Sequence, residues 1–318
     1  MSQASIKKKR LDIDGVLLLD KPAGISSNDA LIKAKRALNA KKAGHTGTLD
    51  PFATGLLPIC FGEATKFSQD LLDADKTYET VVHLGVATTT GDTEGDVLKT
   101  SDAVSFAKDE IEAVLNRFRG DILQVPPMYS ALKRDGKPLY EYARAGVELE
   151  REARPVSILE LTLLDWTSPF LTLRVKCSKG TYIRVLGEDI GNALGCGAHL
   201  RALRRVQVGS LGIEKAISLA DIELKSPEEV AMKNDRLEPV DYLLSSCPSI
   251  SLNEALTKRF LNGQRLSLAK EGIQLSVESG RCRIYAAENG VFMGTAQLRN
   301  DGILAPERLV SLARMPES

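Results

Sequence analysis

Two kinds of hydrophobic spacing alternate along this chain of 318 residues, and they constrain its fold more than any other feature. Apolar side chains with the two-residue spacing of a half-buried strand occur in residues 78–86 and 171–177. Helical spacing occurs in residues 101–119 and in a segment that begins near Thr181 and buries Ile183, Leu186, Ile190 and Leu194. Strands interleaved with helices, some joined by tight turns, predict a mixed α+β domain.

The N-terminal region predicts one buried strand and one basic helix. The run GVLLL, residues 15–19, is stopped by Pro22. Residues 26–29, SSND, offer N-caps for a helix that ends near Leu38. Lysine plus arginine equal aspartate plus glutamate in the whole chain, at 42 each, but residues 1–50 carry ten basic and five acidic side chains. Such a local excess of positive charge permits binding of a polyanion.

The sequence past Asp241 changes in character. The segment SSCPS, residues 245–249, is typical of a linker. Turn signals then occur at 279–280, 289–290 and 300–302, between short apolar-polar alternations. We therefore expect residues 249–318 to form a small β-rich module, shaped as a compact barrel.

Composition favours a cytoplasmic location. The five cysteines include no C-x-x-C pair, and with three histidines they form no spacing of metal ligands, which is typical of reduced thiols in a cytosolic protein. No apolar run reaches the length of a membrane span. The first twelve residues, MSQASIKKKRLD, lack the apolar core of a secretory signal and predict a basic arm.

One carboxylate stands out, in the segment GHTGTLDPFATG of residues 44–55. Asp50 precedes Pro51, which is the ordinary arrangement of a helix N-cap and first helical residue. Three glycines, at 44, 47 and 55, let the surrounding backbone turn sharply and approach a ligand. Asp50 is therefore either a cap or a reactive carboxylate on a fixed loop.

Two further segments carry candidate site residues. Arg184, in SKGTYIR (178–184), lies at the start of a predicted helix, where it can pair with Glu188 on the surface or with Asp50 in a site. The segment HLRALRR, residues 199–205, places an apolar stripe of Leu200, Leu203 and Val206 beside three arginines. A solvated helix face is the common interpretation of that pattern, and a contact to an RNA backbone is the sharper one.

Several long segments resemble the TruB family of tRNA pseudouridine-55 synthases. The resemblance covers nearly the whole chain in order, and motifs of this length are far more specific than one short pattern. They are residues 20–31 (DKPAGISSNDAL), 44–69 (GHTGTLDPFATGLLPICFGEATKFSQ), 76–79 (KTYE), 125–146 (VPPMYSALKRDGKPLYEYARAG), 151–156 (REARPV), 177–184 (CSKGTYIR), 195–205 (GCGAHLRALRR) and 288–309 (ENGVFMGTAQLRNDGILAPERL).

The resemblance implies a role for each candidate residue. Asp50 matches the family's catalytic aspartate, and Arg184 matches the arginine paired with it. Tyr78 matches the tyrosine that stacks on the target base, and His45 matches the histidine that helps to extrude the uridine. Two further residues, Tyr182 and Leu203, fall on positions that line the uridine pocket, and Lys21 falls in a supporting motif beside the site.

The implied reaction agrees with these residue types. Isomerising uridine to pseudouridine breaks the N1–C1′ bond, turns the base and joins C5 to C1′, so it requires no cofactor or metal. An ionised Asp50 either attacks C1′ or removes the C2′ proton, and a nearby guanidinium helps in both cases. Extruding the base costs a few kcal/mol, which an aromatic face such as that of Tyr78 partly recovers.

The resemblance also implies an architecture and a partner. We expect a basic arm at 1–12, a catalytic domain at 13–244 with a mixed, largely antiparallel sheet, and a PUA-like RNA-binding domain at 249–318. A segment inserted at about 124–152 is expected to clasp the RNA. The expected partner is the T-arm stem-loop of tRNA, bound by a monomer that needs no protein partner.

Two alternatives remain open at this stage. One is a guide-RNA-dependent synthase of the dyskerin type, although the compact ends and the insertion favour a stand-alone enzyme. The other is a tRNA-binding folding factor without essential catalysis, which the set of Asp50, Tyr78 and Arg184 argues against.

Overall fold

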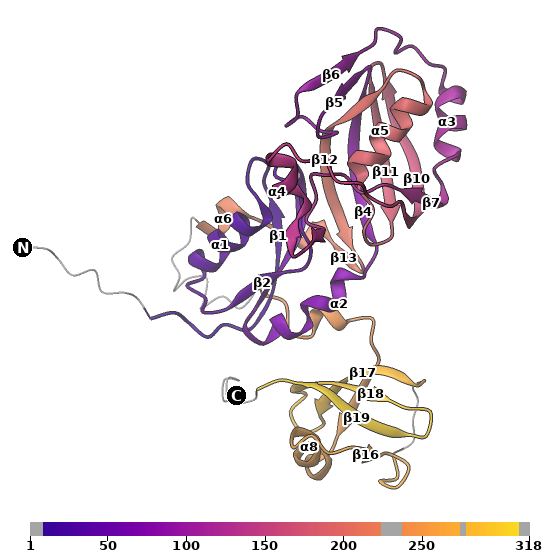
Figure 1. Ribbon diagram of the computed structural model, residues 1–318. Coiled ribbons are helices and arrows are strands. Elements are labelled where there is room, and N and C mark those ends of the chain that lie inside the picture. Colours follow the sequence, from indigo (N-terminus) through magenta and orange to yellow (C-terminus); the bar gives the residue numbers. More distant parts are fainter. Residues whose placement is uncertain (1–8, 224–236, 274–277, 312–318) are drawn as a thin grey trace, which may run out of the picture.

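Two main sheets organise the protein in the computed structural model, which describes residues 9–223, 237–273 and 278–311. One sheet has ten strands and the other has five. Figure 1 shows the five-stranded sheet, coloured orange to yellow, below the larger body that carries the ten-stranded sheet. Most of the expected basic arm lies outside the described residues, since only 9–12 of it are described.

The large sheet is mixed and largely antiparallel, as the family resemblance implies. Its order is β14-β1-β3-β12-β4-β11-β10-β7, with β2 paired to β3 and β13 paired to β12. The pairs β1–β14 and β3–β12 are parallel, and the others are antiparallel. The strands are β1 (Gly15–Lys21), β2 (Ala43–His45), β3 (Thr54–Phe61), β4 (Lys76–Leu84), β7 (Gly120–Gln124), β10 (Arg154–Thr167), β11 (Phe170–Cys177), β12 (Ala198–Val208), β13 (Leu211–Gly212) and β14 (Ile217–Ser218).

Short helices and two small hairpins surround this sheet. The hairpins are β5 (Val86–Thr88) with β6 (Val97–Thr100), and β8 (Lys133–Arg134) with β9 (Lys137–Pro138). The helices of the body are α1 (Ser27–Ala37), α2 (Ser68–Leu72), α3 (Lys108–Asn116), α4 (Leu139–Arg144), α5 (Ile183–Ala193) and α6 (Leu219–Glu223), with 3₁₀ turns η1 (Gly62–Phe67), η2 (Ile213–Lys215) and η4 (Tyr242–Leu244). No helix in the described ranges combines the length and the apolar character that crossing a membrane requires.

Local signals set several element boundaries. Ser26 caps α1 as predicted, because its hydroxyl accepts a hydrogen bond from the backbone N–H of Asp29 and the Asp29 carboxylate reaches back to Ser26. The helix expected over 101–119 is shorter, because α3 begins only after Ala107, whose backbone N–H donates to the Glu110 carboxylate. Capping chemistry, rather than apolar spacing, therefore decides where α3 begins.

The predicted helical stripe at 199–205 is wrong, since these residues lie within strand β12. The pairing of β12 with β4 shifts register between Leu200 and Ala202. This irregularity returns Leu203 to the face that Leu200 occupies, so two buried leucines three residues apart imitate a helix. A bulged strand and the first turn of a helix both place buried apolar residues three positions apart. Pairing with β4 makes this segment a strand.

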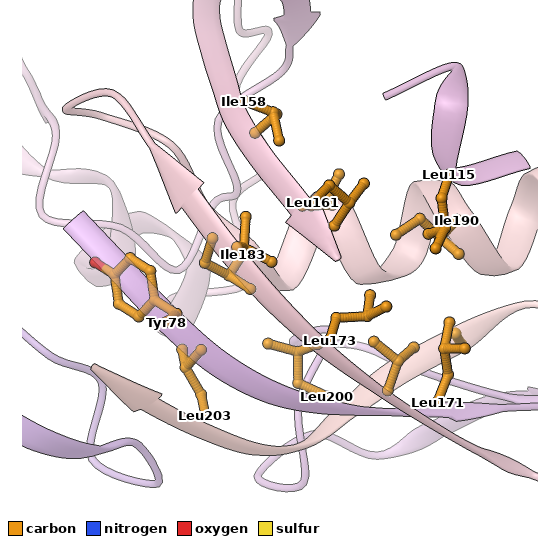
Figure 2. Close-up of a cluster of buried hydrophobic side chains, with 14 of the residues drawn as sticks. Tyr78, Leu115, Ile158, Leu161, Leu171, Leu173, Ile183, Ile190, Leu200 and Leu203 are labelled. Carbon is orange, nitrogen blue, oxygen red and sulfur yellow. The ribbon is translucent and has the colours of Figure 1, made fainter. Parts of the chain in front are cut away.

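Helix α5 covers one face of the large sheet and closes its main core. Figure 2 shows Ile183 and Ile190 of α5 facing the strand residues Leu173 and Leu200, all of them buried. The helix lies very close to β12, because a methyl group at Gly191 would come within 2.4 Å of the Ala198 Cβ atom. Close packing at Gly187 and Gly191 thus fixes the middle and the C-terminal part of α5 against β12.

Among the described residues, the five-stranded sheet does not close into the expected compact barrel. Its order is β15-β17-β18-β19-β16, with β15 and β16 at the two ends. Its elements are β15 (Ser249–Leu252), α8 (Glu254–Leu261), β16 (Leu266–Ser267), β17 (Gly280–Ala286), β18 (Phe292–Leu298) and β19 (Ile303–Leu309). The residues with turn signals, 289–290 and 300–302, connect antiparallel strands as predicted. The parallel pairing of β15 with β17 has no signal in the local sequence.

The segment η1–α2 of the larger body contacts the five-stranded sheet through both apolar and charged side chains. Phe67 and Phe292 pack edge to face, with ring centroids 5.5 Å apart. Arg281 of β17 forms an ion pair with Asp70 of α2. The 245–249 segment is held as well, since the Cys247 carbonyl accepts a hydrogen bond of 3.0 Å from Arg283 Nε. This segment is therefore a packed connection and not a free linker.

Candidate active site

A cavity of about 230 Å³ lies where the loop before β3 meets β4, β12 and the start of α5. It contains one carboxylate, Asp50, and three cationic side chains, Lys76, Arg184 and Arg205. The remaining lining residues are Gly47, Thr48, Leu49, Leu72, Tyr78, Ser178, Gly180, Thr181, Tyr182, Ile183 and Leu203. A neighbouring cavity of about 470 Å³ lies between α5 and the 124–152 segment, but Asp50 is not among its lining residues.

Asp50 lies in the loop between β2 and β3, and it caps no helix. The Ala53 N–H donates a hydrogen bond of 3.1 Å to the Asp50 carbonyl and so closes a turn. Strand β3 then begins at Thr54. The helix-cap alternative for Asp50 is therefore wrong. On the other side, the Leu49 N–H donates to the Ser27 hydroxyl and the Leu49 carbonyl accepts from it, at 2.8 and 3.0 Å. The loop is thus tied to the start of α1.

Arg184 meets the Asp50 carboxylate with two of its nitrogens. Arg184 Nε lies 2.9 Å from Asp50 Oδ2, and Nη2 donates to Oδ1 at 3.3 Å. The guanidinium also donates to the carbonyl oxygens of Thr90 at 2.9 Å and Tyr129 at 2.7 Å, and it lies 3.5 Å from Asp92. The Arg184 side chain is only 4% exposed. A surface pair with Glu188 is therefore wrong as an account of Arg184.

The Asp50 carboxylate has one open side and one enclosed side. Its side chain is 38% exposed, because it faces the cavity, while Arg184 covers its other side. Burial raises the pKa of the Asp50 carboxyl, the Arg184 guanidinium opposes that rise, and the charge of Asp92 adds to it. The carboxylate is thus held in place by a bidentate partner while its basicity is kept above that of an ordinary aspartate.

Three other predicted site residues line the same cavity. Tyr78 of β4 is 9% exposed, and Leu203 of β12 is 6% exposed. Figure 2 shows these two side chains next to one another at one end of the apolar core. Tyr182 precedes α5, and both its backbone groups bind the side chain of Gln124, at 2.8 and 3.1 Å. An aromatic and aliphatic wall therefore faces the Asp50–Arg184 pair.

Lys21 and His45 are not among the residues that line this cavity. The Lys21 ammonium donates to the carbonyl oxygens of Pro22, Ile25 and Pro51, at 2.9, 2.8 and 3.2 Å, so it anchors the residue after Asp50. Burial lowers the pKa of Lys21 to about 8, against the attraction of Asp50. His45 pairs with Ile59 in the sheet, and burial lowers the pKa of its imidazole.

The sequence interpretation missed three charged residues of this site, one of which, Lys76, appears in it only as part of the KTYE motif. Arg205 belongs to a segment predicted as either a solvated helix face or a contact to an RNA backbone, yet it is 1% exposed and lines the cavity. Asp92, from the loop that follows β5, is 2% exposed beside Arg184. Strand alternation with a bulge in 198–208 could have indicated the burial of Arg205. No local signal marks Asp92. In the described ranges, no cluster of three histidine, cysteine or carboxylate side chains has a metal-binding arrangement.

Comparison with known families matches nearly the whole chain. The model of the TruB family pseudouridylate synthase N-terminal domain matches residues 35–183. The model of the tRNA pseudouridylate synthase B C-terminal domain matches residues 184–245. The model described as pseudouridine synthase II TruB, C-terminal, matches residues 248–310.

Individual relatives and solved structures agree with the family models. A protein of Burkholderia mallei named tRNA pseudouridine synthase B is 60% identical over 302 residues, covering 95% of this chain and 98% of the relative. Its namesake in Cupriavidus metallidurans is 57% identical, covering 95% and 96%. Among solved structures, an H/ACA RNP bound to a substrate RNA has a TM-score of 0.69 at 25% identity, covering 93% of this chain and 84% of that one. A Cbf5–Nop10–Gar1 complex has a TM-score of 0.68 at 26% identity, with the same coverage.

Proposed function

This chain belongs to the TruB family of pseudouridylate synthases, and we propose that it isomerises uridine 55, in the T-arm loop of tRNA, to pseudouridine. The observation that carries this proposal is the environment of the Asp50 carboxylate. Arg184 Nε and Nη2 contact its two oxygens at 2.9 and 3.3 Å, and its other side is open to a cavity of about 230 Å³. The 60% identical relatives named tRNA pseudouridine synthase B support tRNA as the substrate.

Asp50 is the proposed catalytic residue. The reacting sugar approaches the open side of its carboxylate, where Asp50 either attacks C1′ or removes the C2′ proton. Both steps need the ionised form, and the Arg184 guanidinium favours that form. Arg184 also fixes the direction of the carboxylate, because two N–H···O contacts allow little rotation.

The apolar wall of the cavity is the proposed site of the extruded base. A uracil ring that leaves its stack can lie against Tyr78, with Leu203 and Tyr182 completing the wall. Lys21 is proposed to hold the Asp50 loop, through its hydrogen bond to the Pro51 carbonyl. His45 is proposed to assist base extrusion from outside this cavity, and that role rests on the family resemblance.

The rest of the molecule is proposed to bind the tRNA as a monomeric, cytoplasmic enzyme. We propose that residues 13–244 form the catalytic domain, that 124–152 clasps the T-arm and that 249–318 forms a PUA-like RNA-binding domain. The Tyr129 carbonyl, which accepts from Arg184, links the clasping segment directly to the site. No cofactor or further protein is needed for this chemistry.

A guide-RNA-dependent synthase is the second candidate, since solved structures of that machinery resemble this chain at 25 and 26% identity. The relatives at 57 to 60% identity carry the tRNA name and match the chain over 95% of its length, so we favour a stand-alone enzyme. Purified protein alone should therefore convert an unmodified tRNA transcript. A need for guide RNA and added proteins would favour the second candidate.

The test of catalysis compares Asp50→Asn with the wild-type protein on the same transcript. This substitution keeps the shape of the side chain but removes its charge, so we expect no detectable pseudouridine and nearly unchanged tRNA binding. Mass-spectrometric mapping measures the product and its position. Turnover by Asp50→Asn would contradict the catalytic role, and tRNA binding without turnover by wild-type protein would favour a folding factor.

A further inference from the structure

Arg205 is a buried cation in the wall of the active-site cavity, and the proposed mechanism gives it no role. Its side chain is anchored by hydrogen bonds from Nε to the Leu56 carbonyl at 2.8 Å and from Nη1 to the Thr48 carbonyl at 3.2 Å. Both acceptors are neutral, and within the part of the chain that the structure describes no carboxylate pairs with this guanidinium. A full positive charge is thus buried at the site without a counter-ion.

The other two cations of the cavity are already engaged with protein acceptors. Arg184 is engaged with Asp50, Asp92 and two backbone carbonyls. The ammonium of Lys76 donates to three carbonyl oxygens, those of Leu71, Leu72 and Ala74. Arg205 differs from both, because its Nη2 is buried and has no hydrogen-bond partner among the described residues. A buried, unsatisfied donor is rare and costly unless a ligand or a movement completes it.

Arg205 and Tyr78 are direct cross-strand partners. They oppose one another in the antiparallel pairing of β12 with β4, so their side chains share one face of the sheet. Burial raises the pKa of the Tyr78 phenol, and the nearby Arg205 guanidinium opposes that rise. The cross-strand register therefore places the guanidinium beside the phenol, although Nη2 makes no hydrogen bond to its oxygen.

We propose that Arg205 stabilises the negative charge that the uracil acquires when its glycosidic bond breaks, and that it acts through the hydroxyl of Tyr78. This inference rests on the proposed function. In the complex with the extruded base, Arg205 Nη2 moves to donate to the Tyr78 oxygen, and the Tyr78 hydroxyl donates its own proton to a carbonyl oxygen at the edge of the uracil, whose ring lies off-centre against Tyr78. Arg205 is accordingly a positioning residue, since it reaches the base only through Tyr78.

The electron balance of the reaction explains why such a charge is needed. When N1–C1′ breaks, its electron pair stays with N1, and the detached uracil is an anion with charge on N1 and on both carbonyl oxygens. When C5 bonds to C1′, the ring supplies the pair, C5 then loses its proton, and N1 gains one. A preorganised donor beside the carbonyl oxygen lowers the barrier to the first step.

The test uses single-turnover rates on two tRNA transcripts, which carry uridine or 5-fluorouridine at the target position. Both rates are measured as loss of the starting nucleoside, because C5 of 5-fluorouridine carries no proton that could be lost in the last step. Fluorine stabilises the uracil anion, so cleavage of that base depends less on the protein. For Arg205→Gln we expect a loss of about 100-fold with uridine and of about 10-fold or less with 5-fluorouridine. Arg205→Lys, which keeps the charge, should lose less. The control is Arg174→Gln, an exposed residue paired with Glu79 on the opposite face, which should match the wild type.

A structural role for Arg205 predicts equal losses on both transcripts, and that result would overturn the proposal. If Arg205→Gln does not fold, Arg205→Lys decides in a cycle with Tyr78→Phe. If Arg205 acts through Tyr78, Arg205→Lys must reduce the single-turnover rate by a smaller factor in the Tyr78→Phe protein than in the wild-type protein. Equal factors in the two backgrounds would refute the proposal. Wild-type protein that leaves the uridine transcript unchanged would contradict the proposed function itself, so the two failures are distinguishable.

Discussion

Arg184 and Asp50 are 134 residues apart in the chain and form a two-point ion pair, with Nε–Oδ2 at 2.9 Å and Nη2–Oδ1 at 3.3 Å. The pair joins the start of α5 to the loop before β3, so it depends on how these elements pack across the sheet. Its asymmetry matters for function, because Arg184 is 4% exposed while Asp50 is 38% exposed. In the proposed mechanism, the buried Arg184 orients the carboxylate, and the open side of Asp50 meets the substrate.

Two substitutions of Arg184 should separate the effect of its positive charge on turnover from the effect of its two-point contact with Asp50. Arg184→Ala leaves the Asp50 carboxylate without a partner, so we expect turnover to fall by about 100-fold or more. Arg184→Lys keeps a positive charge but cannot form the two parallel contacts, so it should also lose activity, by about 10-fold. Single-turnover rates on an unmodified tRNA transcript measure both. Near-normal rates in Arg184→Ala would show that the pair is only structural.

The pH dependence of turnover should report the Asp50 carboxyl. Because catalysis needs the ionised form and burial raises the pKa of Asp50, activity should fall with decreasing pH at values above the ordinary aspartate pKa of about 3.9. Asp92 adds to that rise, so Asp92→Asn should move the fall in activity to lower pH. Asp96→Asn, an exposed position in the same loop, is the control. A fall unmoved by Asp92→Asn would contradict this account.

Glu188 should make stability depend on pH in the opposite way to a paired carboxylate. Burial raises its pKa to about 7, so the folded state binds this proton more tightly than the unfolded state between the ordinary value and pH 7. The stability contributed by Glu188 is therefore lost as pH rises through that range. The melting temperature of Glu188→Gln minus that of the wild type should therefore increase as the pH is raised from 5 to 8. The exposed Glu150→Gln should show no such change, and equal gains in both variants would refute the burial effect.

Gly55 should not tolerate a side chain. Its φ angle is +105°, and a methyl group there would come within 2.3 Å of the Arg205 carbonyl oxygen. We expect Gly55→Ala to cost at least about 2 kcal/mol, because backbone strain and a backbone clash add together. Gly136→Ala separates the two effects, since its φ is +80° but its side chain would enter open space. Urea unfolding measures the loss in free energy of unfolding for each variant. Equal losses in Gly55→Ala and Gly136→Ala would show that the clash at Gly55 is relieved.

The sequence predicted much of the fold where the signals are local. The N-cap residues at 26–29 marked the start of α1, and alternation marked β4 and β11. The turn signals near Asn289 and Asn300 marked the hairpins of the second sheet. It failed where a long-range pairing imposes an irregularity. The bulge near Leu200 arises from pairing with β4, and no local periodicity distinguishes it from a helical turn.

For the site, the sequence by itself determined which residue types are present and, through the motif around Asp50, the family to which they belong. Only the tertiary structure decided which charges meet. Arg184 had a plausible partner four residues away in Glu188, yet packing of α5 against β12 brought it to Asp50 and Asp92. Arg205 was expected on a helix face open to solvent or to RNA, yet pairing of β12 with β4 buried it opposite Tyr78. Ion pairs and burial are set by distance in space, and separation along the chain carries almost no information about that distance once strands cross a sheet.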